Sequence, residues 1–363
     1  MKKYLYLDDE ALDAIKPIID GLNRSGKIVV ERVPLEQDET IDRVYSSLRK
    51  IQYDGIIVDY MLNGTGPFHI GCNSHSIAQY LRDLAEQGES KSFPIVLCST
   101  NQNIKRQLQN GYTSNDLYDF HFAKDIDINY ELIASRLENI AVGYEEIIKS
   151  GKDISHILKR AISNLDPRPF EPFAKSIQTK RCADLILQDF FKFSGLLISE
   201  EILCARLGIA KVGSYKEILS IFDRAKYSGV FNELGRYYWF DIVSGIFREY
   251  FNENMASLDA EEKVELMKRK FVKASLEVAP IGVNNNSKRY WTTCEKTGVA
   301  LDPMEGYRLK EAIVLKPWQE PHYVSFSAIS DGYVDYSDVI ESDLERYTRK
   351  VDFISKRKNN GKE

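Results

Sequence analysis

The chain has 363 residues, enough for two or three domains. Its composition is that of a globular protein, with 43% hydrophobic and 28% charged residues and a net charge of −5. Residues 1–143 contain 15 basic and 21 acidic side chains, so the rest of the chain carries a net charge of +1. Neither part has the strongly basic balance of a protein that binds nucleic acid through its charge.

The cysteines and the hydropathy of the chain predict where the protein works. The five cysteines are scattered and include no CxxC pair, which indicates a reduced, intracellular protein with free thiols. The first residues lack the long apolar run of a signal peptide, and no run of about 18 apolar residues exists that could span a membrane. We therefore expect a cytoplasmic protein that does not interact with membranes.

The first part of the chain alternates strands with helices. Short apolar runs at residues 4–7, 28–33, 55–58, 93–98 and 120–123 predict five strands. Between the strands, apolar residues spaced three and four apart predict helices at 10–22, 40–51, 76–87 and 104–112, and a closing helix at 128–149. This alternation is typical of an α/β fold with a parallel sheet covered on both faces. A ligand of such a sheet binds beyond the carboxyl ends of the strands.

Three acidic residues and one lysine fall at those strand ends. Asp8 and Asp9 follow the first strand, Asp59 ends the strand within "IIVDYMLNG", and Lys124 follows the last strand, "FHFA". Because parallel strands end at the same edge of a sheet, we expect these four side chains to lie close together. The sequence therefore predicts a site for Mg²⁺ and a phosphoryl group.

The chemistry of such a site assigns a role to each residue. An aspartate, here Asp59, can act as a nucleophile and carry a phosphoryl group as an acyl phosphate. The three carboxylates and the backbone carbonyl of Met61 would bind Mg²⁺, which prefers oxygen ligands. Lys124 would pair with one phosphoryl oxygen, and the hydroxyl of Ser99 would donate a hydrogen bond to another.

Residues 1–143 resemble the receiver domain of two-component response regulators. The likeness lies in "LDDE" after the first strand, "VDYMLNG" around Asp59, "PIVLCST" with Ser99, and "HFAK" with Lys124. It implies a flavodoxin-like, doubly wound, five-stranded domain, with Asp59 as phosphoacceptor and a kinase phosphohistidine as donor. It also implies that Ser99 and His121 form a switch that responds to the phosphoryl group. The loop after Asp59 carries an insertion, which removes no residue that this chemistry requires.

The rest of the chain is mainly helical and then mixed. A proline-rich stretch at 166–172 predicts a joint. Residues 199–240 resemble a winged helix in outline, with a helix capped by Ser199 and ended by Gly208, a second helix and an aromatic hairpin. A charged helix at 255–278 and β-rich stretches at 288–330 follow. We divide the chain into a receiver domain at 1–150, a helical, winged-helix-like domain at 151–254 and an α+β region at 255–363.

Two functions remain open for the part after the receiver. Winged helices bind DNA or proteins, and residues 175–250, with 11 basic and 9 acidic side chains, lack the charge typical of DNA binding. The first function is a phosphorelay component that acts through protein contacts or as a phosphate sink. The alternative is a DNA-binding transcriptional regulator that uses residues 199–240.

The expected partners depend on these two functions. The main partner is a cognate histidine kinase, and a receiver-linked effector protein, a second copy of the chain and DNA are further candidates. The C-terminal half is loosely similar, without a motif, to receiver proteins of bacterial phage-defence systems, in which a kinase, a receiver decoy and a toxic effector are encoded together. No catalytic motif appears after the receiver, so we expect a signalling protein rather than an enzyme.

Overall fold

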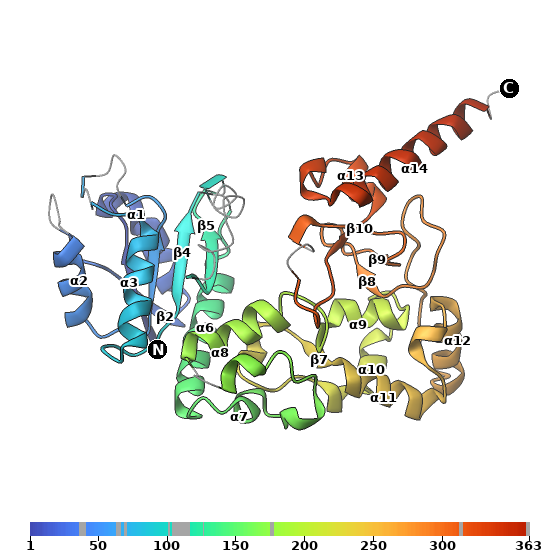
Figure 1. Ribbon diagram of the computed structural model, residues 1–363, viewed down its shortest axis with the longest axis horizontal. Helices are drawn as coiled ribbons and strands as arrows, with labels where there is room; N and C mark the ends of the chain where they lie inside the picture. Colours follow the sequence, from blue (N-terminus) through green and yellow to red (C-terminus); the bar gives the residue numbers. More distant parts are fainter. Residues whose placement is uncertain are drawn as a thin grey trace. The chain divides into compact units, whose positions relative to one another are not determined.

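The computed structural model describes residues 1–35, 41–62, 67–68, 71–100, 102–103, 117–125, 127–174, 178–311 and 315–360. The chain forms two compact units (Figure 1). Unit 1 comprises Met1–Ile162, Phe170–Leu187 and Gly229–Leu234. Unit 2 comprises Ser163–Pro169, Gln188–Ser228 and Gly235–Glu363.

Unit 1 is built on a five-stranded parallel sheet. Its strands are β1 (Lys2–Leu7), β2 (Ile28–Arg32), β3 (Gly55–Asp59), β4 (Ile95–Ser99) and β5 (Phe120–Ala123). They pair in the order β2-β1-β3-β4-β5. Every residue of β3 and β4 is buried, which explains why these strands read as continuous apolar runs. The predicted flavodoxin-like doubly wound sheet is confirmed.

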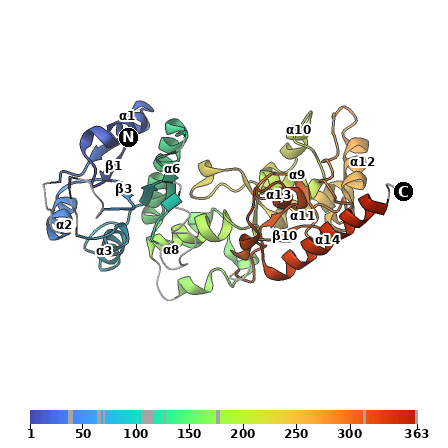
Figure 2. The ribbon, with the colours of Figure 1, turned by 90° about the horizontal axis from the view of Figure 1, so that it is seen from above.

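Helices cover both faces of the sheet, as Figure 2 shows. In the described part of the chain these helices are α1 (Leu12–Arg24), α2 (Ile41–Lys50), α3 (Ser74–Glu86) and α6 (Tyr130–Lys149). Successive side chains of a strand point to opposite faces. Tyr4 and Tyr6 therefore pack with α1 and α6, whereas Leu5 and Leu7 pack with α2 and α3. The predicted helix at 104–112 lies outside the described residues.

Unit 1 also contains shorter segments, among them α7 (Ile154–Leu158), α8 (Thr179–Asp184) and a 3₁₀ turn at Asn232–Leu234. Helix α8 and the 3₁₀ turn both pack against α6. Phe231 has a left-handed backbone (φ 68°) and lies over Gly143 of α6, where a β-carbon would come within 2.1 Å of the phenyl ring. A glycine at position 143 therefore allows this close approach.

Unit 2 begins with a helical region around a two-stranded antiparallel sheet. Its elements are β6 (Leu197–Ser199), α9 (Glu200–Leu207), α10 (Tyr215–Ser220), β7 (Tyr237–Trp239) and α11 (Phe240–Phe251), and β6 pairs with β7. Ser199 caps α9 by accepting a hydrogen bond from the Ile202 amide, and Gly208 ends it with φ 73°. Both helix boundaries were predicted from the sequence and are confirmed.

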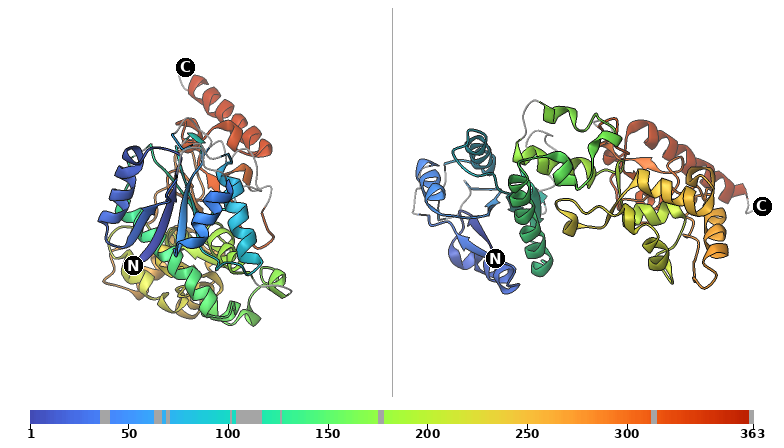
Figure 3. Two further views of the ribbon diagram at one scale, coloured as in Figure 1. Left: turned by 90° about the vertical axis from the view of Figure 1, so that its left-hand side faces the viewer. Right: turned by 90° about the horizontal axis from the view of Figure 1, so that it is seen from below.

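The C-terminal part of unit 2 combines α12 (Ala260–Lys270), β8 (Thr292–Thr293), β9 (Ala300–Leu301), β10 (Tyr307–Arg308), β11 (Tyr323–Val324), α13 (Phe326–Ser330) and α14 (Glu341–Asn360). Helix α14 leads to the C-terminus (Figure 3). The helix predicted over 255–278 was wrong at both ends, because α12 begins at Ala260 and stops at Lys270. The backbone of Glu277 and Val278 instead pairs with Ala210 and Ile209.

The structure bears on two expectations about the cysteines and the hydropathy of the chain. All five cysteines are free, as their spacing predicted. Among the described residues, no helix is long and apolar enough to cross a membrane.

Candidate functional site

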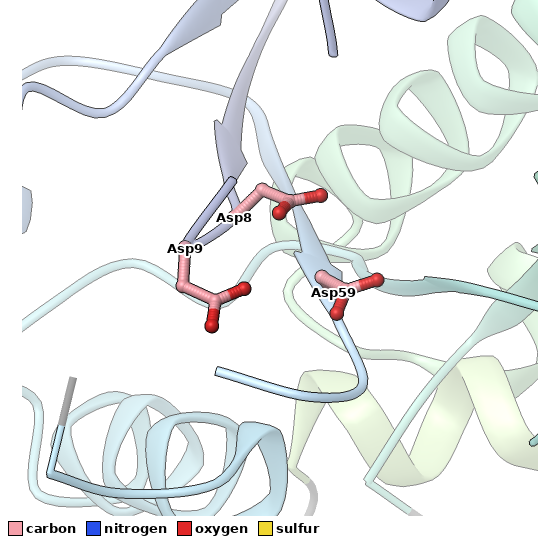
Figure 4. A group of neighbouring side chains, drawn as sticks. All are labelled: Asp8, Asp9 and Asp59. Atoms are coloured by element: carbon pink, nitrogen blue, oxygen red, sulfur yellow. The ribbon is translucent and has the colours of Figure 1, made fainter. Parts of the chain in front are cut away.

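An acidic site lies at the carboxyl edge of the parallel sheet. Asp8 and Asp9 directly follow β1, and Asp59 is the last residue of β3. Leu7 of β1 pairs with Val58 of β3, so the two strands end side by side. One carboxylate oxygen from each aspartate lies within 4.8 Å of the others (Figure 4). The structure therefore brings together the three acids that the sequence placed at one edge.

The three carboxylates are buried, and backbone amides fix two of them. The exposed fractions are 0% for Asp8, 3% for Asp9 and 3% for Asp59. The Glu10 amide donates to Asp8 Oδ1 at 2.9 Å, and the Met61 amide donates to Asp59 Oδ2 at 2.8 Å. These bonds orient two of the carboxylates before any ligand binds, which reduces the cost of ordering them on binding.

Lys124 supplies a positive charge to this site. It follows β5, and its backbone amide donates to the carbonyl of Ser99 at 2.8 Å, so the ends of β4 and β5 are joined. Its Nζ lies 2.7 Å from Asp59 Oδ1 and 3.4 Å from Asp8 Oδ2. One lysine therefore contacts two of the three buried carboxylates.

Burial and charge shift the pKa values of the site. Burial raises the pKa of Asp59 to about 6, because desolvation, helped by the Asp8 charge, outweighs the opposing effects of Lys124 and the Met61 amide. Burial opposes the charged form of Lys124, but the Asp59 and Asp8 carboxylates outweigh it and raise the Lys124 pKa. Three acids and one lysine thus leave an excess of negative charge in a buried place.

A hard divalent cation suits this arrangement. Oxygen ligands are what Mg²⁺ prefers, and it usually binds through a few carboxylates while keeping several water molecules. The acids meet at the end of a sheet, and their charge exceeds that of Lys124. The residues present therefore fit Mg²⁺, with Asp8, Asp9 and Asp59 as its side-chain ligands.

The other predicted site residues lie on β4, in the loop after β3 and on β5. Ser99 is buried at the end of β4, and its hydroxyl accepts a weak hydrogen bond from Asn103 Nδ2 at 3.4 Å. The side chain of Met61 is 46% exposed, and its proposed ligand is the backbone carbonyl. His121 is exposed on β5, and by strand alternation it points away from the face that Phe122 joins. Their roles toward a phosphoryl group stay predictions.

Arg32 was missed in the sequence. It ends β2, and its Nη2 donates to the carbonyl of Glu10 at 2.7 Å. Its guanidinium lies 4.5 Å from the ring centre of Phe68, in the loop after β3. A signal existed, because Arg32 is a charged residue at the carboxyl end of a predicted strand, as Lys124 is.

No protein-family model matches the chain, and no curated protein matches it. The signal receiver domain of a signal transduction histidine kinase from Syntrophus aciditrophicus is 17% identical, over 39% of this chain and 92% of that one, with a TM-score of 0.27. A chain from the co-crystal structure of the Saccharomyces cerevisiae histidine phosphotransfer signaling protein Ypd1 and the receiver domain of its downstream response regulator Ssk1 is 12% identical, over 39% of this chain and 89% of that one, with a TM-score of 0.28.

With TM-scores this low, neither likeness carries weight, and the class of the N-terminal domain is defined by its strand order and its site. The order β2-β1-β3-β4-β5, with an acidic trio and a lysine at its carboxyl edge, is the arrangement that the resemblance to receiver domains implied. The predicted resemblance of the N-terminal part of the chain to receiver domains is thereby confirmed at the level of the fold.

Proposed function

We propose that the N-terminal domain accepts a phosphoryl group from a histidine kinase onto Asp59. The observation that supports this most is the position of Asp59, which shares a buried acidic trio with Asp8 and Asp9 and lies 2.7 Å from Lys124 Nζ. A carboxylate attacks an anionic phosphoryl group only where nearby cations neutralise the negative charge. Lys124 and an Mg²⁺ ion bound by the trio would do so.

In this reaction an oxygen of Asp59 forms a new bond to phosphorus, while the phosphorus–nitrogen bond of the donor phosphohistidine breaks. The leaving imidazole nitrogen keeps the electron pair and takes up a proton from water. Mg²⁺ supplies charge neutralisation when bound, with the Met61 carbonyl as a further ligand. Lys124 pairs with one phosphoryl oxygen, and Ser99 donates to another. His121 then turns inward behind Ser99.

We favour a protein that acts through protein contacts or as a phosphate sink over one that binds DNA. The region at 199–240 offers few free cations, because most of the basic side chains there are paired with acids. Lys211 pairs with Glu201 at 2.8 Å, and Arg236 pairs with Glu200 at 3.0 Å. Such pairing reduces the positive charge that phosphate backbones require. A place in a phage-defence relay remains a prediction from the sequence.

The DNA-binding alternative has one feature in its favour. After α9 and α10, the backbone of Lys226 forms an antiparallel β-bridge with Tyr238 of β7. Strand β7 also pairs with β6. A helix pair followed by an antiparallel sheet is the order of a winged helix. Binding of the phosphorylated protein to DNA with a salt dependence typical of phosphate contacts would favour this alternative over protein contacts.

Phosphotransfer tests the proposed function directly. The full-length protein is incubated with Mg²⁺ and either a phosphorylated histidine kinase or acetyl phosphate, and its mass is followed over time. We expect Asp59→Ala to abolish labelling. Asp20→Ala is the matched control, because Asp20 is an exposed acid on α1 that pairs with Lys16 of its own helix. Labelling of Asp59→Ala at the wild-type rate would overturn the assignment.

A further inference from the structure

Arg32 lies beside the acidic site, on the side of β1 away from β3. In the sheet order β2-β1-β3-β4-β5, β2 is an outer strand next to β1, and β5 is the outer strand at the other edge. Arg32 pairs with Tyr6 of β1, two residues before Asp8. One cation therefore ends each outer strand, Arg32 on β2 and Lys124 after β5, and the acids lie on the strands between them.

Two contacts hold the Arg32 guanidinium at the rim of the site. Nη2 donates to the Glu10 carbonyl at 2.7 Å, in the turn that carries the acidic pair. The guanidinium lies over the ring of Phe68 at 4.5 Å, and the Phe68 amide donates to the Asp9 carbonyl at 3.2 Å. Arg32 thus connects the loop after β1 with the loop after β3, which are the two loops that border Asp59.

The hydrogen bonds of Arg32 are incomplete. Its Nε is buried and has no hydrogen-bond partner within the described part of the chain. Burial lowers the Arg32 pKa, and the charge of Asp8 acts in the opposite direction. A buried donor without an acceptor is rare in proteins and needs an explanation, and a ligand that binds at the site is one.

A bound phosphoryl group would supply that acceptor and also needs a further cation. A phosphoryl group carries a charge of about −2 near neutral pH. Together with Asp8 and Asp9, this charge exceeds what Mg²⁺ and Lys124 neutralise. The ends of β2 and β3 are two strand spacings apart, about 10 Å, a gap that a long arginine side chain and a phosphoryl group at Asp59 can bridge. The planar fork of arginine matches phosphate oxygens.

We propose that Arg32 is a second phosphate-binding residue of this site. Arg32 would contact the donor's phosphoryl group as that group approaches Asp59, on the side of Asp59 opposite to Lys124. The inference rests on the proposed function, because it assumes that Asp59 accepts phosphoryl groups. It assigns Arg32 to recognition of the incoming dianion and leaves the bond-forming step to Asp59.

The test compares Arg32→Gln and Arg32→Lys with the full-length wild type. The phosphoryl donor is acetyl phosphate, and the rate is measured over a range of its concentration at saturating Mg²⁺. We expect Arg32→Gln to raise KM for acetyl phosphate about tenfold or more, with a smaller change in the maximal rate. Arg32→Lys should recover part of the loss, since it keeps the charge without the fork. Arg49→Gln is the control, because Arg49 lies on α2 and pairs with Glu89.

A second measurement separates binding from a structural role. If Arg32 only fastens the two loops, Arg32→Gln should weaken Mg²⁺ binding and acetyl phosphate use together. If Arg32 binds the phosphoryl group, calorimetric titration should show Mg²⁺ affinity unchanged or higher, because a positive charge near Asp8 is gone. An unchanged KM, or a parallel loss of both affinities, would overturn the inference alone. A wild type that no donor phosphorylates, and that Mg²⁺ with beryllofluoride does not bind, would overturn the proposed function and this inference together.

Discussion

Asp59 lies where burial favours its protonated form. Desolvation raises its pKa to about 6 in the folded state, whereas an aspartate of an unfolded chain has a pKa of about 3.9. The folded state therefore binds the proton more tightly, and this contribution to stability is present below the unfolded pKa and lost as pH rises through about 6. An ionised Asp59 destabilises the metal-free domain at neutral pH.

We therefore expect Asp59→Asn to stabilise the metal-free protein. The free energy of unfolding of unit 1 should rise by up to about 3 kcal/mol at pH 7.5 and by little at pH 4. Urea denaturation with a chelator, followed by far-UV circular dichroism, measures both values. Saturating Mg²⁺ should remove the advantage, since the wild type then gains binding free energy that the variant loses. A stabilisation that is equal at both pH values would contradict the pKa argument.

The length and pattern of each strand explain which parts of the fold the sequence could predict. The strands of unit 1 were predictable because each is a continuous apolar run between helices of clear period, and the parallel order then placed Asp8, Asp59 and Lys124 at one edge. The strands β8 to β11 have two residues each, too few for alternation to be recognised. Arg32 was missed because its partners, Glu10 and Phe68, are brought to it only by the fold.

A buried ionic network joins three helices of unit 1 to the residue before β5. Asp119, just before β5, is fully buried and accepts hydrogen bonds from Arg82 of α3 at 2.7 Å and from Tyr144 of α6 at 2.6 Å. Lys180 of α8 lies 3.6 Å away. Burial alone would raise the Asp119 pKa, but Arg82 and Lys180, with the hydrogen bonds, lower it. Asp119 therefore stays ionised, and its charge depends on Arg82.

Removing Arg82 should accordingly cost much more than removing one hydrogen bond. We expect Arg82→Met to lower the free energy of unfolding by about 3–5 kcal/mol, because Asp119 is left buried without its main counter-ion. Tyr144→Phe removes one bond to the same carboxylate and should cost about 1 kcal/mol. Urea denaturation of the two variants measures the difference. Equal losses would mean that the network acts as independent hydrogen bonds.

Two helical glycines offer a matched pair at the level of the element. In α6, a β-carbon at Gly143 would come within 2.1 Å of the Phe231 ring, whereas no atom lies within 4 Å of such a carbon at Gly245 in α11. We expect Gly245→Ala to stabilise by about 0.5–1 kcal/mol through helix propensity. Gly143→Ala should destabilise by about 1–3 kcal/mol, since the helix must move away from Phe231. Thermal unfolding measures both, and a stabilising Gly143→Ala would contradict the contact.

The unfolding of the two units can be followed by different signals. All three tryptophans, Trp239, Trp291 and Trp318, lie in unit 2. The acidic site lies in unit 1. Tryptophan fluorescence therefore reports the unfolding of unit 2, whereas calorimetry reports both units. Unit 1 also includes Phe170–Leu187 and Gly229–Leu234, so the two units are distinguished by their contacts and not by a single cut in the chain.

This division predicts how a phosphoryl mimic acts on the complete protein. Mg²⁺ with beryllofluoride at about 100 times its Kd should stabilise the unit that binds it by about 2.7 kcal/mol, which raises the calorimetric Tm of unit 1 by about 5–10 °C. The fluorescence transition of unit 2 should shift far less. Asp59→Ala should show no shift in either signal. If both signals rise together, the two units unfold as one cooperative block, and binding at Asp59 then also stabilises unit 2.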